Sequence, residues 1–357
     1  MSRASRNDDA LYMPAEWKRH AATWMGWPHH NADWPGKFAA IPWVYGEIAR
    51  HVTRGEDLRL LVENAAHEAR ARRVLEAARA DLKRVRFHRW RTNRGWTRDF
   101  GPIFVRRGRR GKLAIAGFRF NAWARYSKYR KDLKIAARAA RALRLRCLPV
   151  TLRGRHVVLE GGAIDVNGRG TLLTTEECLL DPRVQVRNPG FTRKDYEAVF
   201  ERAFGVRNTI WLGHGIAGDD THGHVDDLCR FVNRDTVVLI QEEHRRDRNY
   251  KALQENRERL QGARLENGSK LNVVHLPMPH PLYHGGVRLP ASYANFYIAN
   301  AAVLVPTFND SNDREALGIL GELFDRPVIG IHAVDLVLGY GTLHCLTQQQ
   351  PREIREA

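Results

Sequence analysis

Cys345 is the residue whose setting best suits it to act as a nucleophile. It follows a glycine-rich stretch (residues 339–341) and a mostly apolar segment (residues 333–338) that predicts a buried strand. Glycines allow a sharp turn that leaves the sulfur uncovered, and an accessible thiolate is the reactive form of cysteine. The other cysteines lie in or beside apolar stretches and predict small buried side chains without a chemical role: Cys147, Cys178 and Cys229.

Two carboxylates with glycines nearby are further candidates for chemistry. Asp99 lies in a polar and aromatic stretch (residues 95–102), and Glu160 precedes two glycines that keep the approach to it open. A buried aspartate is costly unless it is paired, so Asp99 implies a cationic partner, most simply Arg98 or another local arginine. A thiol together with carboxylates suits attack on a carbon centre that carries positive charge.

The densest polar cluster is residues 218–227, which contains the pattern His222-x-His224-x-Asp226. If this segment is a strand, alternate residues share a face and these three side chains point together. A His-Asp pair suits general acid–base chemistry. The pattern also resembles the ligand motif of binuclear zinc hydrolases, but Asp227 stands where that motif needs a histidine. We therefore expect no metal and no cofactor, with a metal-dependent hydrolase as the less favoured alternative.

Helical signals recur along the chain at intervals of about 55–65 residues, which suggests repeated units. Apolar residues at intervals of three and four predict five helices, with Thr192 and Asp313 as N-caps and Gly205 as a stop. A short apolar strand, a glycine-bearing loop and, in most units, a hairpin follow each helix. The expected helices are 65–80, 132–145, 192–204, 248–261 and 313–324, the strands after them are 85–88, 146–150, 209–212, 272–276 and 328–332, and the hairpins lie at 103–115, 163–168, 228–240 and 296–305.

The candidate residues occupy equivalent places in these units. Equivalent positions of repeated units are expected to occupy equivalent places in the fold. We therefore counted about 12 residues onward from the later part of the strand that follows each helix. In four units this step reaches a residue that could take part in a reaction. The four residues are Asp99, Glu160, His224 and Cys345, whereas the fourth unit along the chain reaches Gly286, which carries no chemistry. If the units are arranged radially, the four chemical residues converge on the axis.

Composition narrows the classes of protein to consider. The net charge of +18 is typical of nucleic-acid-binding proteins, but only ten of the 58 basic residues are lysine, which indicates a coding bias toward arginine. The densest basic run (residues 106–112) predicts a solvated hairpin tip, so we do not expect nucleic acid as a partner. The sequence contains no apolar run of about 18 residues, which is the length that a membrane-spanning helix needs, so we expect no membrane span. An N-terminus without an apolar signal core and four widely spaced cysteines favour a cytoplasmic protein.

With these residues assembled, the chain resembles the agmatine deiminase branch of the guanidine-modifying, pentein-fold superfamily, together with the bacterial-type peptidylarginine deiminases. The resemblance implies a fivefold pseudosymmetric α/β propeller of ββαβ units, folded as a single catalytic domain over residues 1–357. The segments that carry it span nearly the whole chain: MPAEW (13–17), WTRDFGP (96–102), EGG (160–162), LLTTEECLL (172–180), GHVD (223–226), YANFYIAN (293–300) and HCLTQQQP (344–351).

The resemblance implies hydrolysis of the guanidinium group of agmatine to N-carbamoylputrescine and ammonia, a reaction of putrescine and polyamine metabolism. Cys345 is implied to attack the guanidinium carbon and form a covalent thiouronium, while Asp99 and Asp226 bind the guanidinium nitrogens. His224 is implied to protonate the departing ammonia and then to activate water. Glu160 is implied to belong to the same carboxylate cluster.

The charges expected around the nucleophile fit this chemistry. Carboxylates near Cys345 raise the pKa of its thiol in the free enzyme, whereas a bound cation favours the thiolate. We therefore expect ionisation of the thiol to be completed only as the substrate binds. Trp96 is implied to stack against the substrate, and Asp219 or Asp220 can meet a distal ammonium group.

One loop departs from the family pattern. After Phe-Asn-Ala-Trp (residues 120–123), where agmatine deiminases usually carry glycines, this chain has Arg125 and Lys128. Surface positions are the favoured interpretation, but if both residues face the pocket they favour a substrate with a carboxylate, such as arginine or peptidyl-arginine. The expected partner is a small guanidino compound, most simply agmatine, with no membrane and with a homodimer left open. The tryptophans near the N-terminus predict core or lid packing, and one of them can wall the pocket: Trp17, Trp24, Trp27 and Trp34.

Overall fold

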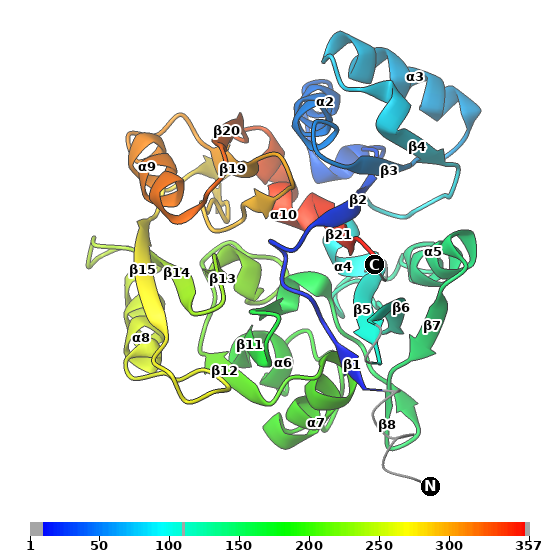
Figure 1. The fold of residues 1–357 in the computed structure, drawn as a ribbon. Coiled ribbons are helices and arrows are strands. Elements are labelled where there is room, and N and C mark those ends of the chain that lie inside the picture. The colour runs from blue at the N-terminus through cyan, green and yellow to red at the C-terminus, as the bar shows by residue number, and fades with distance from the viewer. Residues whose placement is uncertain (1–9, 109–110, 354–357) are drawn as a thin grey trace, which may run out of the picture.

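The computed structural model describes residues 10–108 and 111–353, in which short strands and helices alternate along the chain. These residues form five mixed β-sheets of three or four strands, together with two small two-stranded sheets. Every mixed sheet combines antiparallel with parallel strand pairs. Figure 1 shows the sheets and their helices distributed around the short helices α4 (Thr97–Phe100) and α10 (Leu343–Leu346).

Each mixed sheet is built mainly from strands that are neighbours along the chain. In spatial order the strands of the five sheets are β1 (Leu11–Tyr12), β5 (Ile103–Arg107), β6 (Lys112–Gly117) and β7 (Arg146–Pro149); β10 (Asp165–Val166), β11 (Thr171–Thr175) and β12 (Asn208–Leu212); β13 (Cys229–Phe231), β14 (Thr236–Gln241) and β15 (Asn272–Pro277); β18 (Tyr297–Ile298), β19 (Val303–Thr307) and β20 (Val328–His332); and β21 (Thr347–Pro351), β2 (His20–Gly26), β3 (Asp57–Leu61) and β4 (Val85–His88). The two-stranded sheets pair β8 (Thr151–Leu152) with β9 (Arg155–His156) and β16 (Tyr283–His284) with β17 (Val287–Arg288).

Helices connect the parallel strands, because a parallel pair requires a long crossover connection. Two helices serve the sheet of β2, β3 and β4, and the other sheets have one or two each. They are α2 (Ile41–Val52) and α3 (Ala65–Ala77) around β3, α5 (Ile135–Leu143) before β7, α6 (Glu176–Leu180) and α7 (Arg193–Phe204) before β12, α8 (Tyr250–Leu260) before β15, and α9 (Asp313–Leu323) before β20.

The five helices predicted from periodicity are present as α3, α5, α7, α8 and α9, and strands β4 and β20 have the predicted bounds. Thr192 begins α7 with a capping box, and Gly205 ends it with a φ of 67°, as expected. The N-cap of α9 is Asn312 rather than the predicted Asp313. Asp313 instead accepts the backbone N–H of Phe308 at 2.9 Å, so its carboxylate stabilises the turn before the helix.

Two elements differ from the sequence predictions. Residues 333–338, predicted to be a strand, are mostly buried without strand pairing, and a 3-10 turn, η6 (Leu336–Gly339), covers their end. A short apolar run does not by itself distinguish a strand from another buried segment. Helix α2 was not among the predicted helices, and it contains Pro42 and Gly46. Pro42 lies in the first turn, where its missing N–H costs nothing, and Gly46 lets α2 pack closely on Ala78.

The basic run at residues 106–112 lies in the β5–β6 hairpin, as predicted. Arg106 is buried, however, and its guanidinium donates to the Gly111 carbonyl at 3.1 Å. The prediction of a solvated tip is therefore wrong for Arg106, since its guanidinium donates within the hairpin and also to the Arg352 carbonyl. Arg109 and Arg110 lie outside the described residues.

Two buried apolar clusters fill the spaces between sheets and helices. Trp24, Trp27 and Trp34 are buried in the larger cluster and Trp17 packs against it, which confirms the prediction of core packing for these rings. Within 10–108 and 111–353, we find no helix with the length and apolar character needed to cross a membrane.

The last described strand joins the sheet of the first long strand. β21 pairs antiparallel with β2, with Gln348 opposite Trp24, and the Trp24 indole N–H donates to Gln350 at 3.1 Å. Helix α10 ends directly before β21. The segment that carries Cys345 is therefore fixed by pairing with the other end of the chain.

Candidate active site

The predicted site residues lie on short helical turns that come after the last strand of a parallel pair. Asp99 lies on α4 and Cys345 on α10. Glu160 and His224 are the N-caps of the 3-10 turns η4 (Gly161–Ala163) and η5 (Val225–Asp227), and Asp226 lies on η5. α4 contacts both η4 and α10, and η4 contacts η5. Four equivalent positions of the repeated units are thus brought together in the middle of the molecule.

His224 lies at the centre of the carboxylates. Its Nδ1 is 3.8 Å from Asp99 Oδ1 and 3.9 Å from Asp226 Oδ1, while its Nε2 is 3.9 Å from Glu160 Oε2. The side chain is fully buried, and neither ring nitrogen has a hydrogen-bond partner among residues 10–108 and 111–353. Burial lowers the pKa of His224, but Asp99 and neighbouring groups raise it well above its ordinary value. The imidazole is therefore held ready to carry a proton among the carboxylates.

Asp99 is buried and held by two donors. The Gly162 backbone N–H donates to Oδ1 at 3.1 Å and the Trp123 indole N–H to Oδ2 at 2.9 Å. Burial raises the pKa of Asp99 to about 7, against the opposing charge of His224. The predicted partner Arg98 is wrong, because adjacent residues of a helical turn face different ways, and Arg98 donates to the His344 carbonyl at 3.2 Å instead.

Cys345 is buried, at 4% exposure, with its sulfur close to a carboxylate and an amide. Sγ lies 3.6 Å from Asp226 Oδ2 and accepts a hydrogen bond from Asn295 Nδ2 at 3.1 Å. Burial and the negative charge of Asp226 raise the pKa of the thiol well above its ordinary value. This is the direction expected from the sequence, so the thiol is favoured until a cation binds nearby.

Asp226 is fixed by a chain of buried groups that reaches the N-terminal segment. His344 Nδ1 lies 2.6 Å from Asp226 Oδ2, and His344 Nε2 lies 2.8 Å from Glu16 Oε2. Glu16 also forms an ion pair with Arg230 at 3.1 Å. Burial raises the pKa of Asp226, but the hydrogen bond with His344 and nearby charges bring it below its ordinary value. Asp226 is therefore held as a carboxylate beside the thiol.

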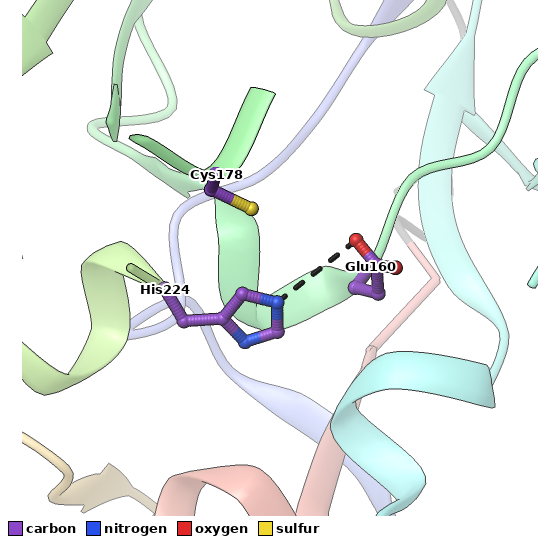
Figure 2. Close-up of side chains that lie close together, drawn as sticks. All are labelled: Glu160, Cys178 and His224. Carbon is purple, nitrogen blue, oxygen red and sulfur yellow. Dashed lines mark ion pairs between the residues drawn. The ribbon is translucent and has the colours of Figure 1, made fainter. Parts of the chain in front are cut away.

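Glu160 is held by a buried arginine on one oxygen and is free on the other. Arg187 Nε donates to Glu160 Oε1 at 3.2 Å, and Oε2 has no hydrogen-bond partner in the described ranges. Burial raises the pKa of Glu160, but the charge of Arg187 lowers it to about 2. Figure 2 shows the free carboxylate oxygen facing the His224 ring, with the Cys178 side chain directed toward the same space.

A cavity of about 260 Å³ leads to Cys345. The predicted substrate-binding residues Trp96 and Asp220 both line it, and the N-terminal segment supplies Ala32 and Asp33 rather than a tryptophan ring. Its lining residues are Ala32, Asp33, Arg94, Trp96, Asp99, Trp123, Tyr126, Asp220, Thr221, Gly339, Tyr340 and Cys345. A larger cavity of about 760 Å³, lined by residues of α2 and α3, contains none of the predicted site residues.

The charges around this cavity are arranged in pairs. Asp220 accepts the Tyr126 hydroxyl at 2.5 Å, and Arg125 Nε lies 3.9 Å from its carboxylate. Arg94 forms an ion pair with Asp33 and lies over the Tyr126 ring, 4.1 Å from its centroid. Arg125 itself is exposed and is not among the lining residues, as the favoured interpretation of a surface position expected.

Lys128 is also exposed, as expected for a surface position. Asp219, in contrast, has a structural role. The Asp219 carboxylate accepts the backbone N–H groups of Gly223 at 2.8 Å and His224 at 3.0 Å, so it shapes the loop that presents His224. Of the two aspartates considered for a distal ammonium group, only Asp220 lines the cavity.

The structure contradicts the expected arrangement of His222, His224 and Asp226 on one strand face. His222 lies in a turn with a φ of 66°, and its Nε2 is 3.0 Å from Asp181 Oδ2, away from His224. Two groups in the described part of the chain have potential metal-ligand atoms within 4.8 Å of one another, and neither includes His222: Glu160, Cys178 and His224 form one, and Asp226, Asp227 and Cys345 form the other. The ligand set of the zinc hydrolase alternative is therefore not assembled.

Sequence reasoning missed several residues that hold the site. Asn295 and His344 lie in segments that carry the family resemblance, and Trp123 lies directly before the loop that departs from it, but none of these positions indicated a role. Glu16 lies in another such segment, next to Trp17. Arg187 lies in none of these segments, and its contact with Glu160 joins two loops, so no local pattern indicates it.

Known proteins match this chain over almost its whole length. A family model described as Porphyromonas-type peptidyl-arginine deiminase matches residues 12–351. Agmatine deiminases of Pseudomonas fluorescens and Stutzerimonas stutzeri are each 35% identical to the chain, over 96% of it and 96% of their own length. Among solved structures, an agmatine deiminase of Enterococcus faecalis has a TM-score of 0.86 at 28% identity, over 97% of both chains. An agmatine deiminase of C. jejuni with substrate bound has a TM-score of 0.84 at 29% identity, also over 97% of both chains.

Fold and matches together define a mixed α/β protein of the deiminase type. The chain belongs to the Porphyromonas-type peptidyl-arginine deiminase family. This confirms the family that the sequence motifs indicated.

Proposed function

We propose that this protein hydrolyses the guanidinium group of agmatine, releasing ammonia and N-carbamoylputrescine. The observation that carries the proposal is the convergence of Cys345, His224, Asp99 and Asp226 beside one cavity, which Cys345 and Asp99 line. The agmatine deiminases that match the chain in sequence and structure support the same substrate.

Two carboxylates receive the substrate cation in this proposal. Asp99 and Asp226 accept hydrogen bonds from the planar guanidinium, which fixes its carbon within reach of the Cys345 sulfur. The cation also opposes the carboxylates that raise the pKa of the thiol. Substrate binding and formation of the nucleophile are therefore coupled, and a free enzyme with a protonated thiol is protected from reaction with other compounds.

The reaction then has two halves, which both use His224 as acid and base. The Cys345 thiolate adds to the guanidinium carbon, His224 gives a proton to the departing nitrogen, and the C–N bond breaks to leave a thiouronium and ammonia. In the second half, His224 takes a proton from water as the water adds to the same carbon. The C–S bond then breaks, which returns the thiolate and leaves a urea group on the product.

We further propose the architecture of a fivefold α/β propeller of the pentein type, with residues 1–357 as one catalytic domain. The recurrence of an antiparallel pair, a crossover helix and a parallel strand in successive sheets supports this arrangement.

Four free cysteines support a reducing, cytoplasmic location. A homodimer stays a prediction that sedimentation at several concentrations can test.

The residues that line the cavity also fit a second class of substrate, guanidino compounds that carry a carboxylate. The carboxylate of Asp220 favours the amine end of agmatine. Arg94 also lines the cavity, and a free guanidinium there favours the carboxylate of arginine or of a peptide. Because Arg94 is already paired with Asp33, we favour agmatine.

A substrate panel tests the proposal directly. Ammonia release is measured for agmatine, arginine and an arginyl peptide at matched concentrations, and agmatine is expected to have the highest kcat/KM. A value for arginine equal to or above that for agmatine refutes the agmatine assignment. Arg125→Gly is expected to change the preference by less than about fivefold, since exposed ion pairs contribute up to about 1 kcal/mol, and Lys128→Gly serves as its matched control.

The same panel tests whether a metal is required. Prolonged chelation is expected to leave activity unchanged, because His222 does not face His224 and Asp226. Activity that is lost on chelation and restored by zinc supports the metal-dependent hydrolase instead.

A further inference from the structure

Cys178 is a buried thiol beside the proposed acid–base residue, and the proposed reaction does not use it. It lies on α6, and its side chain is directed toward the space between His224 and Glu160 (Figure 2). The sequence predicted a small buried side chain without a chemical role for this cysteine. Its neighbours are instead an imidazole and a carboxylate.

The two neighbours each present an unsatisfied atom to this space. His224 Nε2 and Glu160 Oε2 are buried, have no hydrogen-bond partner in 10–108 and 111–353, and lie 3.9 Å apart. The other oxygen of Glu160 is engaged by Arg187, which leaves Oε2 as the free one. Glu160, Cys178 and His224 each supply a potential ligand atom, and these atoms lie within 4.8 Å of one another.

A thiolate, an imidazole and a carboxylate are the ligand types that zinc prefers. Tetrahedral coordination at ordinary zinc–ligand distances places neighbouring ligand atoms about 3.3–3.6 Å apart. The observed distance between Nε2 and Oε2 is 3.9 Å and the sulfur lies within 4.8 Å of both atoms, so the three side chains must move together to coordinate the ion. The thiolate and carboxylate charges balance the ion, water can fill the fourth position, and the thiol proton is released on binding.

We propose that Cys178, His224 and Glu160 form an inhibitory site for Zn²⁺. Zinc bound there occupies Nε2 of His224 and so removes the imidazole from proton transfer. The inhibition rests on the proposed role of His224, whereas binding of the ion does not.

The other group of potential ligands, Asp226, Asp227 and Cys345, is the competing location. It lacks an imidazole, and its sulfur already accepts a hydrogen bond from Asn295. Zinc is a borderline-soft ion that binds nitrogen and sulfur well, so the group with His224 is the better match.

A binding experiment distinguishes the two locations without any need for turnover. Chelator-treated protein is titrated with Co²⁺, whose thiolate band reports a cysteine ligand, and bound Co²⁺ is then displaced by Zn²⁺. Cys345→Ala is expected to keep the band and one equivalent of metal. Cys178→Ala is expected to lose the band and to bind Zn²⁺ at least about tenfold more weakly, and Cys178→Ser covers the case in which the alanine variant does not fold.

Activity gives the second measurement. Stoichiometric Zn²⁺ is expected to inhibit the wild-type protein and the matched control Cys147→Ala, with recovery on addition of chelator, while Cys178→Ala keeps its turnover. A cobalt–thiolate band that survives in Cys178→Ala and disappears in Cys345→Ala overturns the proposal, as does absence of the band from every variant. If the protein shows no deiminase activity at all, the Co²⁺ titration still decides whether the site exists.

Discussion

The backbone at Gly162 passes between three of the proposed catalytic side chains. A Cβ atom built on Gly162 lies 2.5 Å from His224 Nδ1, 2.9 Å from Asp99 Oδ1 and 3.1 Å from Asp226 Oδ2. Favourable contacts between such atoms begin at about 3.5 Å, so in Gly162→Ala the His224 ring or the loop must move by about 1 Å. The residue lies in the 3-10 turn η4 without a positive φ, and alanine therefore meets no backbone strain there.

We expect Gly162→Ala to lower kcat by about 10²-fold, since a displacement of about 1 Å in a catalytic group can cost that much. Ammonia release under saturating substrate measures the effect. Near-ultraviolet circular dichroism and thermal unfolding establish that the variant keeps its fold. A smaller effect on KM than on kcat is expected, because the methyl group contacts His224 most closely.

Gly318→Ala is the matched control. Gly318 lies in α9, and a Cβ atom there has no neighbour within 4 Å. This variant is expected to retain full activity and to be more stable by up to about 1 kcal/mol, as alanine is the better helix former. If Gly162→Ala keeps wild-type kcat, the close spacing around Gly162 does not matter for the reaction and the proposed role of His224 must be abandoned.

Four further changes test other parts of the site and the fold. A fall in kcat/KM is expected as the pH drops through about 7, because burial raises the pKa of Asp99 to about 7 and its protonation removes the charge that binds the cation; an acid limb near pH 5 contradicts this. Asn295→Ala removes the hydrogen bond to the sulfur and the support of α10, so both turnover and stability should fall, the latter by about 1–3 kcal/mol in denaturant unfolding. Cys345→Ala should release no ammonia, and mass spectrometry of the quenched wild-type reaction should find an adduct on the peptide with Cys345. Thr192→Ala should cost about 1 kcal/mol of stability through loss of the capping box while activity is retained.

Local patterns predicted the parts of the fold that local interactions determine. The helix α7 shows apolar periodicity, a threonine that caps its start and a glycine that ends it, so its bounds follow from its own residues. Helix α2 could not be found in the same way, because its glycine is explained only by packing against Ala78. The segment 333–338 has a strand-like composition, but which backbone it pairs with is decided by distant residues.

The site residues that occupy equivalent positions of the repeated units could be predicted from the sequence. Equal steps from the strands reached residues that do meet in space, which is the expected property of repeated units. The fourth unit contributes Asn295, nine positions beyond the Gly286 that the step reached, because the hairpin β16–β17 lengthens that loop. The orientations of Arg98 and His222 could not be read from the sequence, since each is set by contacts with loops that are distant in the chain.

The pairing of β21 with β2 has a consequence for how the protein is made. Trp24 and Gln350, which are hydrogen-bonded across these strands, are 326 positions apart. At a synthesis rate of about 5–20 residues per second, β2 leaves the ribosome roughly 16–65 seconds before its partner strand. During this interval one edge of β2 has no native partner, and such an edge is open to pairing with another nascent chain. The thiol arrives only in the same final stretch, so an incomplete chain carries neither a closed sheet nor the nucleophile.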